Sequence, residues 1–299
     1  MGLNFRKSIS LGKNFKLNIG SKSSSISAGV KGARYSISTN GTRRATFGIP
    51  GTGLSYTKTF GTKKDKKAGD DKKKAKELEK EIKKNTEAVE EYNESLNEVI
   101  GIHRDGVDAV DWNRDSTIPR GCDSLKAGVL AGDIDSYYEV INKVEPFDAL
   151  VDFGSEFEIG TDNPSYICAE FNIKSDDVIP ENKVEMTESG KLVEKPLTKS
   201  GYYEIFQDYV CSVTIRLARD LFALLPVEKV IVHAVDYALN TATGNKEEVT
   251  YLSVAFDRAT FEKLNLDAID PSDSLVNFEH NMKFAKTTGF KPVTQIENW

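Results

Sequence analysis

The side chains at the start of the chain have the chemistry of an anion-binding surface. Residues 1–64 contain twelve Lys and Arg residues and no Asp or Glu, so this segment carries a net charge of +12. Residues 65–100 carry a net charge of −2 and residues 101–299 carry −16, which gives the whole chain its charge of −6. Because a surface with many cations and no anions has a positive potential almost everywhere, it attracts polyanions.

Seven of these cations are the candidate anion-binding residues. Binding of nucleic acid, the commonest intracellular polyanion, depends mainly on neutralising its phosphates. Three kinds of partner stay open. One is a nucleic acid, and another is an acidic protein surface, on this chain, on a second copy or on another protein. The third is an anionic membrane or envelope polymer. The candidates are Arg6, Lys7, Lys13, Lys16, Arg34, Arg43 and Arg44.

The stretch FGIPGTGLSY, residues 47–56, has the glycine spacing of a phosphate-binding loop. Gly48 and Gly53 are five residues apart, as in GxxxxG. A Walker loop also needs a Lys after its last glycine and a helix beyond it. Leu54 holds the Lys position here, and the residues after it alternate like a strand. Pro50-Gly51 is a turn dipeptide, so we expect a turn between two strands and no nucleotide.

A second candidate chemistry lies in the C-terminal half of the chain. The expected order of strands and one long helix resembles the core of restriction-type nucleases, which hold Mg²⁺ with carboxylates beside a lysine. Asp152, Glu170 and Lys174 are the residues available for such a site. Glu170 and Lys174 are four residues apart, however, and not two, as in the usual carboxylate-x-Lys pair. Solvent-facing strand carboxylates are the simpler interpretation, so a metal-dependent enzyme is the alternative function.

Other catalytic or metal-binding patterns are missing from the sequence. Three cysteines and three histidines are scattered along the chain without the paired spacing of metal ligands, and there is no CxxC or GxSxG motif. We expect free buried thiols and expect His233 to be a core residue of a buried strand. The sequence therefore predicts no cofactor, no metal and no small-molecule ligand. The residues concerned are Cys122, Cys168, Cys211, His103, His233 and His280.

The basic segment has the alternation of an antiparallel β module. Apolar residues alternate with polar ones from Phe15 to Ile19, and again on both sides of Asn40-Gly41. Alternation with period two indicates half-buried strands, and Asn-Gly between two such runs is a strong hairpin signal. In this pattern Arg34, Arg44 and the serines between them fall on the solvent-facing side, which predicts a basic face.

The ordered motifs of this segment also resemble those of a known family. FRKS at the start, LGK and LN, the KGAR step and the closing GIPGTGLSYT resemble a small N-terminal module called domain of unknown function 4236. The resemblance covers about residues 2–57. The stretches YYEIFQDYVCSVTIRLARDLFALLPVEKV and DPSDSLVNFEHNMKF look like the segments C-terminal to this module in bacterial relatives. The resemblance implies a bacterial or phage origin and implies no activity.

A charged connector precedes a predicted helix. From about Lys73, apolar residues recur every three or four positions, as in the a and d positions of a heptad seam with Asn85 as its polar member. This seam predicts packing on a neighbouring element of the same chain, with pairing to another chain as the alternative. The seam residues are Ala75, Leu78, Ile82, Asn85, Val89, Tyr92, Leu96 and Val99.

The sequence after the connector predicts first helices and then a domain that mixes helices and strands. One or two amphipathic helices are expected near residues 123–154, with Leu130, Ile134, Tyr138 and Ile141 on one side. Strands are expected in SEFEIG and YICAEFNIK, followed by a hairpin turning at Ser189-Gly190. A long helix from Tyr202 to about Leu225 is stopped by Pro226. The strands KVIVHAVDYA, taken as central, and VTYLSVAFD come next, with helices at ATFEKLNL and after Asp270.

These patterns together predict an α+β protein built from a small N-terminal antiparallel β module, a helical connector and a C-terminal mixed α/β domain. The expected segments are 1–61, 62–100, 101–150 and 151–299, the last being acidic. No transmembrane helix and no signal peptide are recognisable, so we expect a cytoplasmic protein. The expected function is non-catalytic binding through the basic module. The partner is an acidic protein surface or nucleic acid, and the alternatives are a nuclease-like enzyme and a self-assembling structural protein.

Overall fold

The structure is a computed structural model that describes residues 6–10, 15–20, 24–30, 33–39, 41–48, 55–60, 68–174 and 178–297. The chain forms two compact units. The N-terminal unit consists of Met1–Glu94 together with Lys183–Lys195, and the C-terminal unit consists of Ser95–Asn182 together with Pro196–Trp299. None of the helices in the described part of the chain is long and apolar enough to cross a bilayer.

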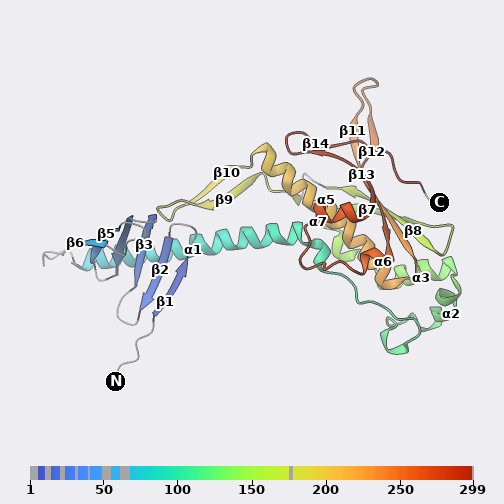
Figure 1. Ribbon diagram of the computed structural model, residues 1–299, viewed down its shortest axis with the longest axis horizontal. Helices are drawn as coiled ribbons and strands as arrows, with labels where there is room; N and C mark the ends of the chain where they lie inside the picture. Colours follow the sequence, from blue (N-terminus) through green and yellow to red (C-terminus); the bar gives the residue numbers. More distant parts are fainter. Residues whose placement is uncertain are drawn as a thin grey trace. The chain divides into compact units, whose positions relative to one another are not determined.

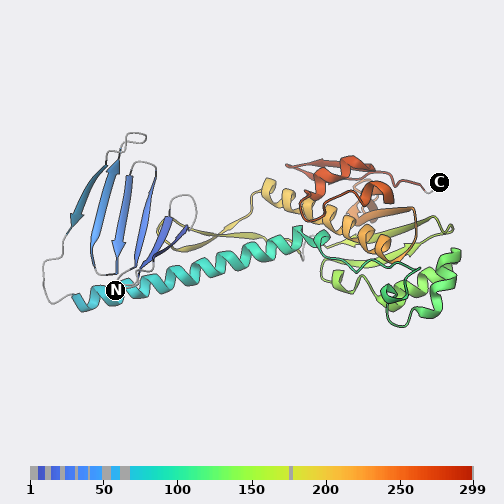
Figure 2. The same cartoon turned by 60° about the horizontal axis from the view of Figure 1, so that its bottom comes forward.

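The N-terminal unit contains a six-stranded antiparallel sheet whose strands follow one another in chain order (Figure 2). Its strands are β1 (Arg6–Ser10), β2 (Phe15–Gly20), β3 (Ser25–Val30), β4 (Ala33–Ser38), β5 (Arg43–Gly48) and β6 (Ser55–Phe60). The predicted hairpin lies between β4 and β5, where Gly41 has a φ of +79° and donates its N–H to the Ser38 carbonyl at 2.8 Å. Consecutive hairpins explain the strand order, since each strand pairs with its neighbour in sequence.

The register of the sheet separates its residues into two faces, because successive positions of a strand point to opposite sides. We call these the polar face and the apolar face. The polar-face positions are Arg6, Ser8, Ser10, Lys16, Asn18, Gly20, Ser25, Ser27, Gly29, Arg34, Ser36, Ser38, Arg44, Thr46, Gly48, Ser55, Thr57 and Thr59. The apolar-face positions are Lys7, Ile9, Phe15, Leu17, Ile19, Ile26, Ala28, Val30, Ala33, Tyr35, Ile37, Arg43, Ala45, Phe47, Tyr56, Lys58 and Phe60.

The predicted heptad seam packs within the chain. Helix α1 (Ala68–Ile100) contacts the hairpin of β9 (Asn182–Met186) and β10 (Leu192–Pro196), which lies within the N-terminal unit almost entirely. Ile82 of the seam is buried, and Asn85 donates its side-chain N–H to the Gly190 carbonyl at 2.8 Å. The hairpin turns at Ser189-Gly190, where the sequence predicts its turn, and Gly190 has a φ of +82°. The polar seam residue Asn85 therefore binds a backbone carbonyl of the same chain.

The C-terminal unit is built on a mixed six-stranded sheet in the order β14-β13-β12-β11-β8-β7. Among these described strands only β8 and β11 pair in parallel, and the other pairs are antiparallel. This makes β11 central, as its apolar sequence predicts. The strands are β7 (Gly154–Gly160), β8 (Tyr166–Ile173), β11 (Lys229–Leu239), β12 (Lys246–Asp257), β13 (Glu279–Ala285) and β14 (Gly289–Lys291).

Helix α5 (Lys199–Leu224) follows the β9–β10 hairpin, precedes β11 and packs on one face of this sheet (Figure 1). Thr198 caps its first turn by accepting the Gly201 N–H at 3.1 Å. From Tyr209 to Leu224 almost every side chain of α5 is buried, so the helix is the centre of the core. Arg216 and Asp220 are also buried there and form an ion pair with a distance of 2.6 Å between Nε and Oδ2.

Shorter elements complete the same core. They are η1 (Ile102–Arg104), η2 (Asp115–Thr117), η3 (Asp123–Leu125), α2 (Lys126–Ala131), α3 (Ile134–Val144), η4 (Asp148–Leu150), α6 (Arg258–Phe261), α7 (Pro271–Ser274) and η5 (Leu275–Asn277). Trp112 is buried and donates its indole N–H to the Leu224 carbonyl at 2.8 Å. Residues 101–150 therefore share one hydrophobic core with residues 151–299, although the sequence suggests two segments there.

The amphipathic face predicted for residues 123–154 agrees with the observed one only in part. Gly132, with a φ of +75°, ends α2, so α2 and α3 are separate helices with independent orientations of their apolar faces. Leu130 is 48% exposed, whereas Val129, Tyr137 and Val140 are buried. Of the other residues predicted on this side, Ile141 is buried and Ile134 and Tyr138 are half-buried, so the break at Gly132 displaces mainly Leu130 from the core.

Candidate anion-binding surface

The polar face of the N-terminal sheet is the candidate functional site. One row of paired positions crosses all six strands and reads Ser10, Lys16, Ser27, Ser36, Arg44 and Thr59. The neighbouring row includes Gly29, Arg34, Thr46 and Thr57. Every polar-face position holds a hydroxyl residue, a basic residue, Asn or Gly. The pleat therefore places the Ser and Thr residues of the six strands on one side, together with four of the seven basic residues that these strands contain.

Arg34 and Arg44 are the two described cations of this face, and both are exposed. Neither makes a salt bridge with any of the residues that the structure describes. Thr46 and Thr57 share a hydrogen bond of 3.1 Å between their Oγ1 atoms on adjacent strands. Guanidinium groups bind phosphate oxygens with paired donors, and hydroxyls add further donors. The face therefore combines free positive charge with hydroxyl donors.

The register divides the seven predicted residues. Arg6 and Lys16 hold polar-face positions along with Arg34 and Arg44. Lys7 and Arg43 hold apolar-face positions, and Lys13 lies outside the described residues. Because neighbours along a strand point to opposite faces, Arg6 with Lys7, or Arg43 with Arg44, cannot share one face. Only four of the seven predicted residues therefore share the polar face.

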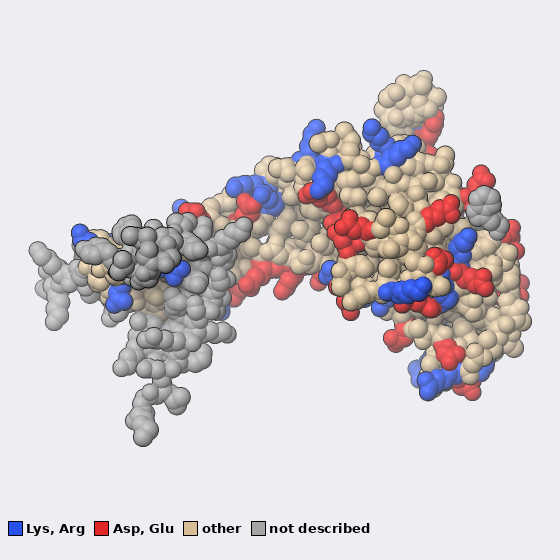
Figure 3. Space-filling view, in the orientation of Figure 1, with Lys and Arg blue, Asp and Glu red and all other residues tan. Residues whose placement is uncertain are grey.

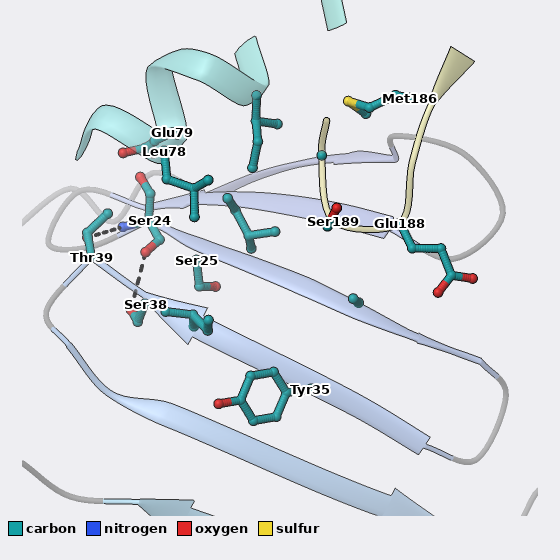
Figure 4. A pocket seen from close by; sticks show the side chains of 15 residues that line it. Ser24, Ser25, Tyr35, Ser38, Thr39, Leu78, Glu79, Met186, Glu188 and Ser189 are labelled. Atoms are coloured by element: carbon teal, nitrogen blue, oxygen red, sulfur yellow. Dashed lines mark hydrogen bonds between the residues drawn. The ribbon is translucent and has the colours of Figure 1, made fainter. Parts of the chain in front are cut away.

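The apolar face carries a cavity that the sequence analysis does not foresee (Figure 4). Leu78 and Ile82 of α1 and Met186 of the hairpin meet Ile26 and Ile37 of the sheet around a volume of about 180 Å³. At one end of the cavity, two side-chain hydroxyl groups form hydrogen bonds with the backbone of Ser24. Thr39 Oγ1 accepts the Ser24 N–H at 3.1 Å, and Ser38 Oγ donates to the Ser24 carbonyl at 3.2 Å. The signal for this cavity is the apolar alternation itself, but its position depends on contacts between residues about 40 to 160 apart in sequence.

The residues of the alternative nuclease-like site do not form a metal-binding cluster. Lys174 Nζ donates to the Val151 carbonyl at 2.9 Å, whereas the Glu170 carboxylate accepts a hydrogen bond of 2.8 Å from Gln295. Asp152 lies in an exposed turn. In the described part of the chain, no group of three or more His, Cys, Asp or Glu side chains is arranged to hold a metal ion. Glu170 therefore has an amide as its observed partner, and Lys174 has a backbone carbonyl.

Glu170 belongs to a polar row on the sheet face opposite α5. Glu158, Glu170, His233 and Ser253 are paired across β7, β8, β11 and β12, beside a cavity of about 580 Å³. Burial raises the pKa of Glu170, and burial lowers the pKa of His233 to about 4. His233 Nδ1 lies 3.0 Å from Ser253 Oγ, which also accepts the Ile296 N–H at 2.9 Å. His233 is thus a neutral, hydrogen-bonded residue of the buried strand.

The three cysteines are free, as the sequence predicts. Cys122 and Cys211 are buried, and Cys168 is half-buried in the sheet face that carries Glu170. Burial, together with the Glu170 charge, raises the pKa of Cys168 to about 11. A thiol with so high a pKa is a poor nucleophile near neutral pH, because the thiolate is the reactive form. These side chains act as small apolar residues of the core.

The structure thus defines a two-unit α+β protein whose N-terminal unit displays a basic, hydroxyl-rich sheet face. Residues 3–57, which form most of that sheet, match the family model described as Protein of unknown function (DUF4236). No curated protein and no solved structure matches the chain. The match covers the segment whose motifs carry the resemblance, and it does not extend to the C-terminal unit.

Proposed function

We propose that this protein is a non-catalytic binding protein whose polar face binds the phosphate backbone of nucleic acid. The observation that carries the proposal is the composition of that face. Its register positions bring together Arg6, Lys16, Arg34 and Arg44 among serines and threonines, without an acidic residue. Phosphate contacts supply most of the affinity in nucleic-acid binding that does not depend on base sequence.

The arrangement supports binding to the backbone and not to the bases. Specific recognition of single strands relies on aromatic side chains that stack on bases, and the polar-face positions include no aromatic residue. Hydroxyl and guanidinium donors instead suit phosphate oxygens, which carry no sequence information. By contrast, cationic and anionic side chains are interspersed over the visible surface of the C-terminal unit (Figure 3). We therefore expect binding that varies little with base sequence.

Two adjacent arginines provide the test with a matched control. Arg44 holds a polar-face position and Arg43 an apolar-face position of the same strand, and both are exposed. Arg44→Ala and Arg43→Ala change the net charge equally. The full-length protein and both variants are titrated with labelled single- and double-stranded DNA and RNA of mixed sequence, over a series of salt concentrations, with fluorescence anisotropy as the readout.

For the unmodified protein we expect the logarithm of the binding constant to fall with the logarithm of the salt concentration with a slope of about −3 or steeper, because several phosphates are neutralised. The proposal expects Arg44→Ala to weaken binding to all sequences alike and to reduce the slope by about one unit, because one phosphate contact is lost. Arg43→Ala leaves the slope nearly unchanged. No binding to any of the nucleic acids overturns the proposal, and so does an equal loss in both variants, which would indicate attraction by net charge alone.

A further inference from the structure

The apolar face of the N-terminal sheet is only partly covered by the rest of its unit. Tyr35 and Ile37 are each 41% exposed, Phe60 is 46% exposed, and Leu78 of α1 is 43% exposed. Side chains of this size and character are usually buried. Leu78 of α1 lies beside Ser24 at the start of β3, Met186 lies on the hairpin at the other side of the cavity, and Tyr35 lies on β4 farther from α1 than Leu78 (Figure 4). The face therefore has an exposed apolar centre beside a cavity.

The charged residues around this centre are arranged on opposite sides of it. Arg43 and Lys58 hold apolar-face positions on β5 and β6, next to Ile37 and Ala45. Glu79 of α1 and Glu188 of the hairpin turn line the cavity on the other side of β4. None of these four residues forms a salt bridge among the residues that the structure describes. The face therefore presents unpaired cations on one side and unpaired anions on the other.

We infer that the occupant of this face is a second copy of the same chain, packed face to face about a two-fold axis near Tyr35 and Ile37. A two-fold axis places the same patch on both copies in contact. Lys58 of one copy then lies opposite Glu188 of the other, and the same contact repeats on the far side of the axis. A patch with both signs of charge divided by its centre is complementary to a second copy when the two-fold axis runs along the dividing line.

The cavity and Phe60 extend this complementarity. Phe60 lies on the edge strand beside Lys58, whose Nζ is 5.6 Å from the centre of its ring. The two-fold arrangement brings the Phe60 of each copy toward the cavity of the other. A cavity of about 180 Å³ is the size that accommodates a single aromatic ring, since apolar cavities of about 150 Å³ bind benzene. We infer that Phe60 fills this cavity across the interface.

The size of the sheet limits the strength of the dimer. Strands about 4.8 Å apart and about 3.3 Å in rise per residue give the whole face an area of roughly 500 Å², and α1 and the β9–β10 hairpin cover part of it. A stable interface buries about 800 Å² on each partner. We therefore expect a weak dimer that dissociates on dilution. This inference goes beyond the proposed nucleic-acid binding and does not depend on it, because it uses the opposite face of the sheet.

The test measures the oligomeric state of the full-length protein by sedimentation velocity over a wide range of concentrations. We expect a reversible monomer–dimer equilibrium, with Phe60→Ala raising the dimer Kd about thirtyfold, the effect of losing a central aromatic contact. Leu239→Ala is the matched control, because Leu239 is 61% exposed in the C-terminal unit and should leave the equilibrium unchanged. A protein that stays monomeric throughout overturns the inference, as does a dimer that Phe60→Ala leaves intact.

Charge reversal distinguishes this interface from any other dimer. Lys58→Glu alone and Glu188→Lys alone each place like charges opposite one another, so each variant should dimerise more weakly. An equimolar mixture of the two variants restores both opposite-charge contacts and should dimerise as well as the unmodified protein. Both residues are exposed, so the variants are expected to fold. If the mixture of the two variants dimerises as weakly as each variant alone, the two-fold arrangement is contradicted.

Discussion

The two six-stranded sheets of this protein differ in how their strands pair and in how much of their surface is buried. The N-terminal sheet pairs only neighbours in sequence, and its polar face is lined by hydroxyl and basic residues. The C-terminal sheet includes one pairing of strands far apart in the chain, β8 with β11, and buries one face under α5. A sheet held by local hairpins needs few long-range contacts, so polar-face residues such as Arg34, Arg44 and Thr57 stay exposed. A sheet that packs on a buried helix gains stability and keeps little surface for binding.

The comparison predicts that the same kind of substitution has very different effects in the two units. Phe171 is fully buried and its ring centroid lies 6.3 Å from that of Phe157, so Phe171→Ala should lower the free energy of unfolding of the C-terminal unit by about 3–5 kcal/mol. Ile37→Ala, at a residue 41% exposed, should cost about 1 kcal/mol or less. Trp112 fluorescence during urea unfolding reports the first value, and hydrogen exchange of β4 reports the second. Similar values would remove the contrast.

Acid should act on the C-terminal unit through His233. Burial lowers the pKa of His233 from 6.5 to about 4. As the pH falls, the unfolded chain therefore takes up the proton before the folded unit does. The contribution of neutral His233 to the free energy of unfolding is fully present above about pH 6.5 and is lost as the pH falls toward 4. This loss amounts to about 3 kcal/mol. His233→Gln, which keeps a partner for Ser253, should flatten this part of the stability profile. An unchanged slope between pH 6.5 and 4 would contradict the assignment.

Asp208 should act in the opposite direction within the same unit. Burial and the nearby Asp270 carboxylate raise the pKa of Asp208 from 3.8 to about 6. The folded state then binds the proton more tightly, so this group destabilises the unit as the pH rises from about 4 to 6. Asp208→Asn should therefore raise the free energy of unfolding by about 2 kcal/mol more at pH 8 than at pH 4. Urea unfolding at both pH values tests this, and equal effects would contradict it.

The hairpin of the N-terminal unit should respond to a smaller change. A Cβ at Gly190 would lie 2.6 Å from Ile82 Cγ1, and the backbone there has a φ of +82°. Gly190→Ala should cost about 1–2 kcal/mol from the backbone alone and more from the contact, increasing hydrogen exchange in β9, β10 and the turns of α1 around Ile82. Gly244→Ala is the control, because Gly244 has a φ of +72° and open space around it. If the two substitutions increase hydrogen exchange around their own turns to the same extent, the contact with Ile82 contributes nothing to the cost of Gly190→Ala.

Much of this architecture can be predicted from local sequence signals. The alternation around Asn40-Gly41, the Ser189-Gly190 turn, the long α5 stripe and the apolar β11 each predict an element that the structure contains. These signals work because turn residues and periodicity act over a few positions. The same alternation places Arg34 and Arg44 on one face, where the register also has them.

Long-range contacts account for the features that the sequence leaves open. The packing of residues 183–195 on α1 joins positions about 100 apart, such as Asn85 and Gly190. The segment boundary expected near residue 150 falls inside a core formed by both sides of it. Charge alone groups Lys7 and Arg43 with the other cations, whereas strand parity separates them. Composition identifies the basic segment, and only the register assigns its residues to faces.

The hairpin that completes the N-terminal unit has a consequence for biosynthesis. Residues 183–195 leave the ribosome after the first 94 residues of the unit, with 88 residues of another unit in between. At about 5–20 residues per second, the sheet and α1 wait roughly 5 to 18 seconds for their last element. During that interval Ile82 and the lining of the cavity lack their cover from Met186 and Gly190. The nascent chain therefore exposes the apolar lining of this cavity until residues 183–195 have been synthesised.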